Sequence, residues 1–251
     1  MIERRGRIVQ LINERGAISF AQLKLAFPDV SEMTLRNDLK ALDEQRLIVR
    51  VHGGAKSVDR IIGTDDLLNK RFCRNVEKKK MIAEKAVNLL LPGTSVFLDS
   101  GSTITEMTKI FPDQPHIVFT TGLTCAMELG RNRKNLQIHM LGGMLNALSM
   151  SVYGSACCES IRRMNYDIAF IGVTGYMNET GFTCGSSDES SLKQAIIEKA
   201  ETVVAVMDST KVGISNTFTF ASVHDIDVVV SDDELAPDIT EYFRNNKLKV
   251  I

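Results

Sequence analysis

The sequence lacks the features that mark membrane and secreted proteins. No run approaches the roughly 20 apolar residues of a membrane span, and Gln10, Asn13 and Glu14 interrupt the apolar segment near the start, so no signal peptide is predicted. The five cysteines, an odd number, include no C-x-x-C pair, which favours free thiols over a disulfide framework or a zinc site. We therefore expect a soluble cytoplasmic protein with no membrane partner.

Motifs of common enzyme classes are also missing. The chain has no P-loop, no dinucleotide-binding fingerprint and no zinc-ligand spacing. Its four histidines are scattered and form neither a metal nor a triad pattern. We therefore predict no catalytic residue, no metal site and no cofactor.

The composition is that of an ordinary globular protein. The 251 residues are 44% hydrophobic and 24% charged, and this length is sufficient for two domains. The net charge of −1 conceals a difference along the chain: residues 1–57 hold ten Lys and Arg against seven Asp and Glu, and the remainder holds twenty against twenty-four. A polyanionic partner is therefore expected to meet the N-terminal part.

Three helices are predicted in the first 45 residues. Apolar residues at helical spacing form the first, which Gly16 can end in a left-handed conformation, and Ser19 with Gln22 forms a capping-box pattern at the start of the second. Ser31 is expected to cap a third helix that begins at Glu32. Three helices with a tight turn between the last two predict a helix-turn-helix, whose third helix enters the major groove of DNA.

The third predicted helix has an apolar and a polar face. Leu35, Leu39 and Leu42 recur at helical spacing on the apolar face. The polar face either is merely solvated, as in any amphipathic surface helix, or reads DNA. In the second case the predicted contacts are Ser31, Glu32, Met33, Thr34, Arg36, Asn37 and Lys40.

A glycine-rich hairpin is predicted directly after these helices. Residues 47–51 are mostly β-branched, and residues 55–58 return after a turn at His52-Gly53-Gly54. Alone this pattern indicates a turn, but behind a helix-turn-helix it indicates a winged helix. The wing adds Arg50, His52, Gly53 and Gly54 to the predicted DNA contacts.

The rest of the chain alternates helices with β-branched strands, which predicts an α/β domain with a parallel sheet covered by helices. A helix at 76–91 is followed by strands at 95–98, 117–120, 137–141, 167–171, 203–207, 228–230 and 248–251. The segment between the wing and this domain mixes charges and short apolar pairs. The predicted division is a winged helix-turn-helix at 1–58, a linker at 59–74 and an effector-binding domain at 75–251.

Small, polar and acidic residues follow the predicted strands, and in open α/β sheets the ligand crevice lies at the carboxyl ends of the strands. Asp99–Thr103 opens a helix whose free amides would cradle a phosphate, Lys211 would add a charge, and Asp99 and Asp208 would bind sugar hydroxyls. Taken singly, each loop is better explained by ordinary turn chemistry, and only the set of loops together favours a ligand site. The predicted effector contacts are Asp99, Ser100, Gly101, Ser102, Thr103, Thr121, Gly122, Gly142, Gly143, Gly172, Asp208 and Lys211.

Two motifs carry a family resemblance. The run S-E-M-T-L-R-N-D-L at 31–39, with R-V-H-G-G-A at 50–55, resembles the signature of the DeoR family of bacterial sugar-catabolism regulators. The strand-end motifs at 99–103, 141–143, 172–175 and 208–211 extend the resemblance over essentially the whole chain. It implies an effector domain similar to ribose-5-phosphate isomerase folds and a phosphorylated sugar as the effector.

Several positions depart from the family's pattern. Asn37 stands where a second arginine is usual, and because asparagine prefers adenine edges and arginine prefers guanine, we expect an altered operator preference. In the effector domain, Gly122 and Thr174 replace the usual asparagine and aspartate, and Ser190-Ser191 replaces small apolar residues. Losing a carboxamide and a carboxylate at the ligand face predicts an altered effector.

The preferred interpretation is a non-enzymatic transcriptional regulator, a repressor of a carbohydrate-utilisation operon that a phosphorylated sugar releases from double-stranded operator DNA. Activation and ligand-strengthened repression stay open as variants of it. An active sugar-phosphate isomerase is the alternative, since Asp99, Asp208, Lys211 and Glu189, which keeps the family's Glu-x-x-x-Lys spacing to Lys193, are able to exchange protons. Because one winged helix-turn-helix contacts little DNA, a homodimer or homotetramer is expected.

Overall fold

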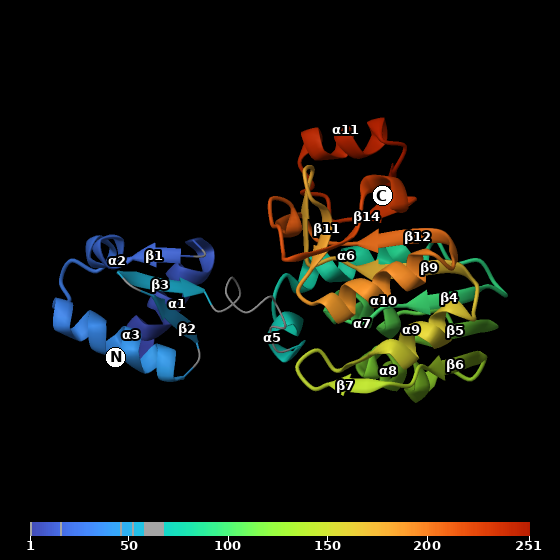
Figure 1. Cartoon of the computed structure of the whole chain (residues 1–251), viewed down its shortest axis with the longest axis horizontal. Helices are drawn as coiled ribbons and strands as arrows, with labels where there is room; N and C mark the ends of the chain where they lie inside the picture. The colour runs from blue at the N-terminus through green and yellow to red at the C-terminus, as the bar shows by residue number, and fades with distance from the viewer. Residues whose placement is uncertain (1, 16, 46, 52, 58–67) are drawn as a thin grey trace. The chain divides into compact units, whose positions relative to one another are not determined.

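The computed structural model describes residues 2–15, 17–45, 47–51, 53–57 and 68–251. The chain forms two compact units, Met1–Thr64 and Asp65–Ile251 (Figure 1). The predicted DNA contact His52 and residues 59–67 of the predicted linker lie outside the described residues. Among the helices that the structure describes, none is long and apolar enough to cross a membrane.

The first unit has the predicted three helices and hairpin. Its helices are α1 (Ile2–Arg15), α2 (Phe20–Ala26) and α3 (Glu32–Glu44), and its strands are β1 (Ala17–Ser19), β2 (Ile48–Val51) and β3 (Gly54–Ser57). The strands form an antiparallel sheet in the order β1-β3-β2. Strand β1 was not predicted, because three residues carry no alternation of their own and become a strand only by pairing with β3.

Local capping chemistry starts the second and third helices where the sequence predicted. The Ser19 hydroxyl accepts a hydrogen bond from the Gln22 amide, and the Gln22 side chain accepts one from the Ser19 amide. The Ser31 hydroxyl accepts from the Thr34 amide at 3.2 Å. The apolar faces then pack together in a small core formed by Ile8, Ile12, Ile18, Leu23, Leu35, Leu39, Leu42, Ile48 and Ala55.

The second unit is built on a seven-stranded parallel sheet in the order β15-β14-β12-β9-β4-β5-β6. All seven predicted strands are present, with small shifts at their ends. They are β4 (Ser95–Leu98), β5 (His116–Thr120), β6 (Leu136–Met140), β9 (Tyr166–Gly172), β12 (Ala200–Val206), β14 (Val228–Val230) and β15 (Lys249–Val250). Because successive side chains of a strand point to opposite faces, Phe97 joins one core while Val96 and Leu98 join another.

Helices cover both faces of this sheet (Figure 1). One face packs against α6 (Val76–Val87), α7 (Ser102–Lys109) and α8 (Leu123–Asn132), and the other against α9 (Ser155–Arg162), α10 (Ser187–Ile197) and α11 (Pro237–Asn245). Helix α6 ends before the predicted Leu91. The Leu89 and Leu90 amides donate to carbonyls three residues earlier, at 3.1 and 3.2 Å, which tightens the chain into turns ahead of Pro92.

Several short elements escaped prediction. The hairpin β7 (Met144–Asn146) and β8 (Ser151–Tyr153) follows β6, and a small antiparallel sheet contains β10 (Gly175–Met177), β11 (Gly181–Cys184) and β13 (Phe218–Ala221). The described residues also form the 3-10 turns η1 (Ser209–Lys211) and η2 (Val223–Asp225).

The predicted linker at 59–74 requires a correction at its C-terminal end. Helix α5 (Leu68–Phe72) lies within it and belongs to the second unit, which begins at Asp65. Leu68 is buried, and its amide donates to the Leu148 carbonyl at 2.9 Å. A helix of this length has too few residues to show a period, so only its tertiary contacts reveal it.

Candidate functional site

The polar face of α3 is open to solvent. Met33 is 70% exposed, and the side chains of Arg36 and Lys40 are 58% and 66% exposed. The guanidinium of Arg36 lies 4.2 Å from the centre of the Phe20 ring, which orients it, and its contact with Glu32 is long at 3.8 Å. An exposed ion pair of this length is weak, so the Arg36 charge can engage an external anion.

Asp38, on the same helix, has a structural role that the sequence analysis missed. Its carboxylate is buried and accepts from Nε of Arg4 at 2.7 Å and from Nε of Arg5 at 2.8 Å. Burial raises the pKa of Asp38, but the hydrogen bonds and charges of the two arginines outweigh it and hold the pKa below its ordinary value. This cluster ties α1 to α3.

The two wing glycines differ in what they require. Gly53 has a φ of +79° in open space, so its backbone conformation alone favours glycine. At Gly54 a Cβ would lie 2.2 Å from the Ile18 carbonyl oxygen, which would break the pairing of β1 with β3. Gly54 is therefore explained by packing, whereas the neighbouring Arg50 is exposed on β2.

A cavity of about 270 Å³ lies in the second unit beside the ends of the sheet strands. Four of the predicted effector residues line it, namely Asp99, Ser100, Thr121 and Gly172. The other polar and charged lining residues come from α5, the β7–β8 hairpin, the turn after β9 and α10. They are Arg71, Asn146, Ser149, Ser151, Tyr153, Thr174, Ser186, Asp188, Glu189 and Lys193.

Lys193 organises one wall of this cavity. Its ammonium group, 2% exposed, donates to Asp99 Oδ2 and to the Gly172 carbonyl, and it lies 3.2 Å from Glu189 Oε1. The Gly172 amide also donates to Asp99 Oδ2, at 3.0 Å. Burial lowers the pKa of Lys193, but the negative charges of Asp99 and Glu189 together have a larger effect and raise this pKa above its ordinary value. Asp99, expected to bind sugar hydroxyls, is thus largely engaged within the protein.

Thr121 contributes a hydroxyl without an internal partner. The side chain is 1% exposed, and its Oγ1 makes no hydrogen bond among the described residues, yet it lines the cavity. A buried hydroxyl left unsatisfied is costly, and a bound ligand would relieve that cost.

Other predicted effector residues lie outside the cavity lining. Gly101, Ser102 and Thr103 begin α7, and Gly101 has a φ of +117°. At Gly122 a Cβ would meet Cys125 Sγ at 3.0 Å, and at Gly143 it would meet the Tyr153 carbonyl oxygen at 2.5 Å, so both positions are packed too tightly for a side chain. The remaining ones are Gly142, Asp208 and Lys211.

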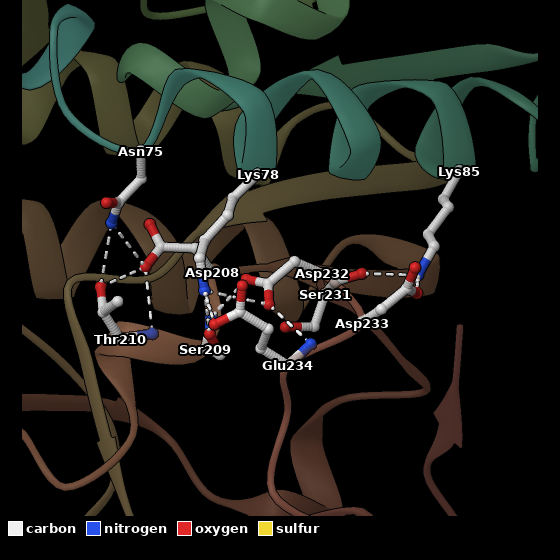
Figure 2. Close-up of polar contacts among 10 residues, drawn as sticks. All are labelled: Asn75, Lys78, Lys85, Asp208, Ser209, Thr210, Ser231, Asp232, Asp233 and Glu234. Carbon is white, nitrogen blue, oxygen red and sulfur yellow. Dashed lines mark hydrogen bonds and ion pairs between the residues drawn. The ribbon is translucent and has the colours of Figure 1, made fainter.

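Asp208 belongs to a separate polar cluster beneath α6 (Figure 2). Its Oδ1 accepts from the Asn75 side chain at 3.2 Å and from the Thr210 hydroxyl and amide. In the same cluster Lys78 donates to the Ser209 hydroxyl at 2.7 Å. Ion pairs of Lys78 with Asp232 and Glu234, and of Lys85 with Asp233, complete it. These contacts fasten α6 to the segments after β12 and β14, so Asp208 has a structural explanation.

Two charged residues of the cavity had little or no signal in the sequence. Arg71 fell within the predicted linker, because no period marks α5. Lys193 was noticed only through its spacing from Glu189, without a role. The spacing was informative, since residues four apart share one face of a helix and both side chains of α10 reach the cavity.

Comparison with known proteins decides the family. Residues 4–61 match the DeoR-like helix-turn-helix domain, and residues 74–233 match the DeoR C terminal sensor domain. The chain belongs to the DeoR family. The resemblance noted in the sequence is confirmed, and membership makes this DeoR-family chain a DNA-binding transcriptional regulator with a sensor domain for a small-molecule effector.

The chain is similar to its relatives over nearly its full length. The HTH-type transcriptional regulator GolR of Listeria innocua is 30% identical over 252 residues, which cover 99% of this chain and 97% of the relative. The HTH-type transcriptional regulator GlpR of Haloferax volcanii is 32% identical, with 99% and 96% covered. Because these relatives are transcriptional regulators, the isomerase interpretation is set aside.

Among solved structures, ribose 5-phosphate isomerase A of Methanocaldococcus jannaschii is similar with a TM-score of 0.41 and 17% identity, over 55% of each chain. A likeness this distant does not indicate which ligand the cavity of this chain binds. Within the part of the chain that the structure describes, no group of His, Cys, Asp and Glu is arranged to hold a metal ion.

Proposed function

We propose that this regulator is a repressor of a carbohydrate-utilisation operon and that a phosphorylated sugar, bound in the sensor cavity, lowers its affinity for operator DNA. The observation that carries this proposal is the chemistry of the cavity. Carboxylates at Asp188 and Glu189, hydroxyls at Ser149 and Ser151 and the unpartnered hydroxyl of Thr121 line one space of about 270 Å³. Such a mixture of donors and acceptors suits a small polyhydroxylated ligand.

The exposed face of α3 supports the DNA half of the proposal. Arg36 and Lys40 offer charges to phosphates or guanine edges, and Asn37 offers a carboxamide suited to adenine. The first unit is small, so one copy would bury too little DNA for tight specific binding. A homodimer or homotetramer that places two DNA-binding units on half-sites about 34 Å apart would supply the additional contact area.

The test is a thermal unfolding screen of the full-length chain against pentose and hexose monophosphates, with the matching unphosphorylated sugars as controls. A sugar phosphate that raises the unfolding midpoint should also release the DNA upstream of the chain's own operon in a gel-shift titration. Stabilisation by the unphosphorylated sugars alone would contradict the phosphate requirement, and consumption of the hit would reinstate an isomerase.

Thr121→Val provides a direct probe of the cavity. Because the Thr121 hydroxyl has no internal partner, its removal should leave the unliganded unfolding midpoint unchanged while weakening sugar-phosphate binding by about 2- to 10-fold. Thr108→Val is the matched control, since the Thr108 hydroxyl donates to the Thr105 carbonyl at 2.7 Å and does not line the cavity. That variant should lose stability and keep its ligand affinity.

A further inference from the structure

Helix α5 forms part of the cavity wall and is the first described element after the first unit. Leu68 anchors it through its buried side chain and through the bond from its amide to the Leu148 carbonyl, in the loop of the β7–β8 hairpin. The helix packs against α7, and Arg71, near its C-terminal end, lines the cavity. Helix α5, the first described element of the second unit, is therefore part of a wall of the sensor cavity.

A buried lysine holds the end of α5 in place. Lys79 of α6, 5% exposed, donates from its ammonium group to the carbonyls of Arg71 and Arg74. Burial lowers the pKa of Lys79 to about 8, with the charges of Lys211 and Arg71 acting in the same direction and that of Asp208 against it. Positive charge is thus concentrated around the turn that follows α5.

The Arg71 guanidinium lies beside the N-terminus of α7. A Cβ built on Gly101, the N-cap of that helix, would come within 3.3 Å of Arg71 Nη2, so the missing side chain leaves room for the guanidinium. Within the described part of the chain, no side chain caps the amides of this helix end. A cation beside the positive end of a helix dipole is unfavourable unless an anion lies between them.

Arg71 shares its cavity with the carboxylates of Asp99, Asp188 and Glu189. Among the described residues, its guanidinium has no ion pair, whereas Asp99 and Glu189 of the same cavity both contact Lys193. The unpartnered hydroxyl of Thr121 lines the same space. The geometry therefore offers the guanidinium of Arg71 and the free buried hydroxyl of Thr121 to one ligand in the cavity.

We propose that Arg71 binds the anionic group of the effector, and that this contact couples the sensor cavity to the DNA-binding unit through α5. The inference rests on the proposed function and adds to it the residue that recognises the anion and the element that responds. A bound phosphate neutralises the repulsion between Arg71 and the end of α7, so occupancy stabilises the docked position of α5.

The test compares full-length wild type with Arg71→Gln, Arg71→Lys and the matched control Arg74→Gln. Arg74 lies three residues further along, is exposed and does not line the cavity. The probes are inorganic phosphate and a set of pentose and hexose monophosphates, added at constant ionic strength. Unfolding midpoints report binding, and hydrogen exchange of the amides at 68–72 reports the docking of α5.

We expect the probes to stabilise wild type and Arg74→Gln and to slow exchange in α5. Arg71→Gln should bind the phosphorylated probes at least tenfold more weakly, show no slowing in α5, and stay on operator DNA when they are added. Arg71→Lys should recover part of the affinity, because it restores the charge without the bidentate geometry of a guanidinium. The unliganded midpoint of Arg71→Gln should not fall, since the substitution removes a repulsive contact.

The contrary outcomes separate this inference from the proposed function. Equal stabilisation of wild type and Arg71→Gln by a sugar monophosphate would overturn the role of Arg71 and leave the proposed function intact. Binding that depends on Arg71 without any change of exchange in α5 would overturn the coupling. If no phosphorylated probe stabilised even wild type, both proposals would fall.

Discussion

The polar face of α3 and the sensor cavity use charged side chains in opposite ways. On α3 the charges of Arg36 and Lys40 lie more than half exposed, with only long contacts to neighbouring carboxylates. In the sensor unit Lys193 is 2% exposed and contacts two carboxylates and a backbone carbonyl. An exposed charge stays hydrated and available to a polyanion, whereas a buried one shapes the cavity around it and cannot leave its partners.

This contrast predicts that Lys193→Met is the most damaging substitution. It leaves Asp99, which is 2% exposed, as an uncompensated buried carboxylate, and the cost should be about 3–5 kcal/mol in the free energy of unfolding of the sensor unit. Urea denaturation measures it. Lys80→Met is the control, since Lys80 pairs with Glu77 on an exposed surface and its loss should not change stability measurably. Equal losses of unfolding free energy in the two variants would contradict the proposed difference between the buried and the exposed lysine.

Asp38→Asn tests whether a buried ion cluster in the first unit behaves in the same way. Arg4 and Arg5 are 28% and 26% exposed, so water can replace the lost carboxylate, and the cost should be smaller, about 1.5–3 kcal/mol. Hydrogen exchange of α1 and α3 in the full chain measures it. A loss larger than that of Lys193→Met would contradict the ranking.

The same site predicts a pH dependence. Because the folded pKa of Asp38 lies below its unfolded value of 3.8, its contribution to stability is complete above that value and is lost as the pH falls through the folded pKa. Asp38→Asn should lack this acid-dependent component, so its exchange rates should converge with those of wild type at low pH.

Arg36→Ala isolates the exposed side of the comparison. Operator affinity should fall by about 1–3 kcal/mol, while the unfolding midpoint and the response of the sensor unit to sugar phosphates stay unchanged. Arg131→Ala is matched in exposure and in its helical ion pair, because Arg131 is 65% exposed and contacts Glu128. Equal operator binding by both variants in a gel-shift titration would show that Arg36 does not contribute to DNA binding.

Prediction from the sequence succeeded where the physical cause is local. Ser31 caps α3 because its hydroxyl reaches an amide three residues away, and Leu35 and Leu39 share a face because of the helical period. The seven sheet strands were predicted for the same reason, since β-branched runs between helices already specify strands. The family motifs at 31–39 and 50–55 then indicated the regulator that the comparisons confirm.

The cavity was predicted only in part, because its contacts join distant residues. The rule that ligands bind at strand ends selected Asp99, Ser100, Thr121 and Gly172, which line the cavity. The same rule selected Asp208 and Lys211, yet Asp208 is engaged in the cluster beneath α6. Only the packing of a particular helix over each strand end distinguishes a ligand-facing loop from a structural one.

The sequence by itself determined which segments become helices and strands, where the helices are capped, and which side of α3 faces outward, since each depends on neighbours within one or two turns. The tertiary structure alone decided that Lys193 meets Asp99 across 94 residues and that Arg71 comes beside Gly101. Those encounters depend on how the chain crosses between strands, and no local pattern encodes them. The exposed polar face of α3 was therefore predicted more completely than the residues that line the sensor cavity.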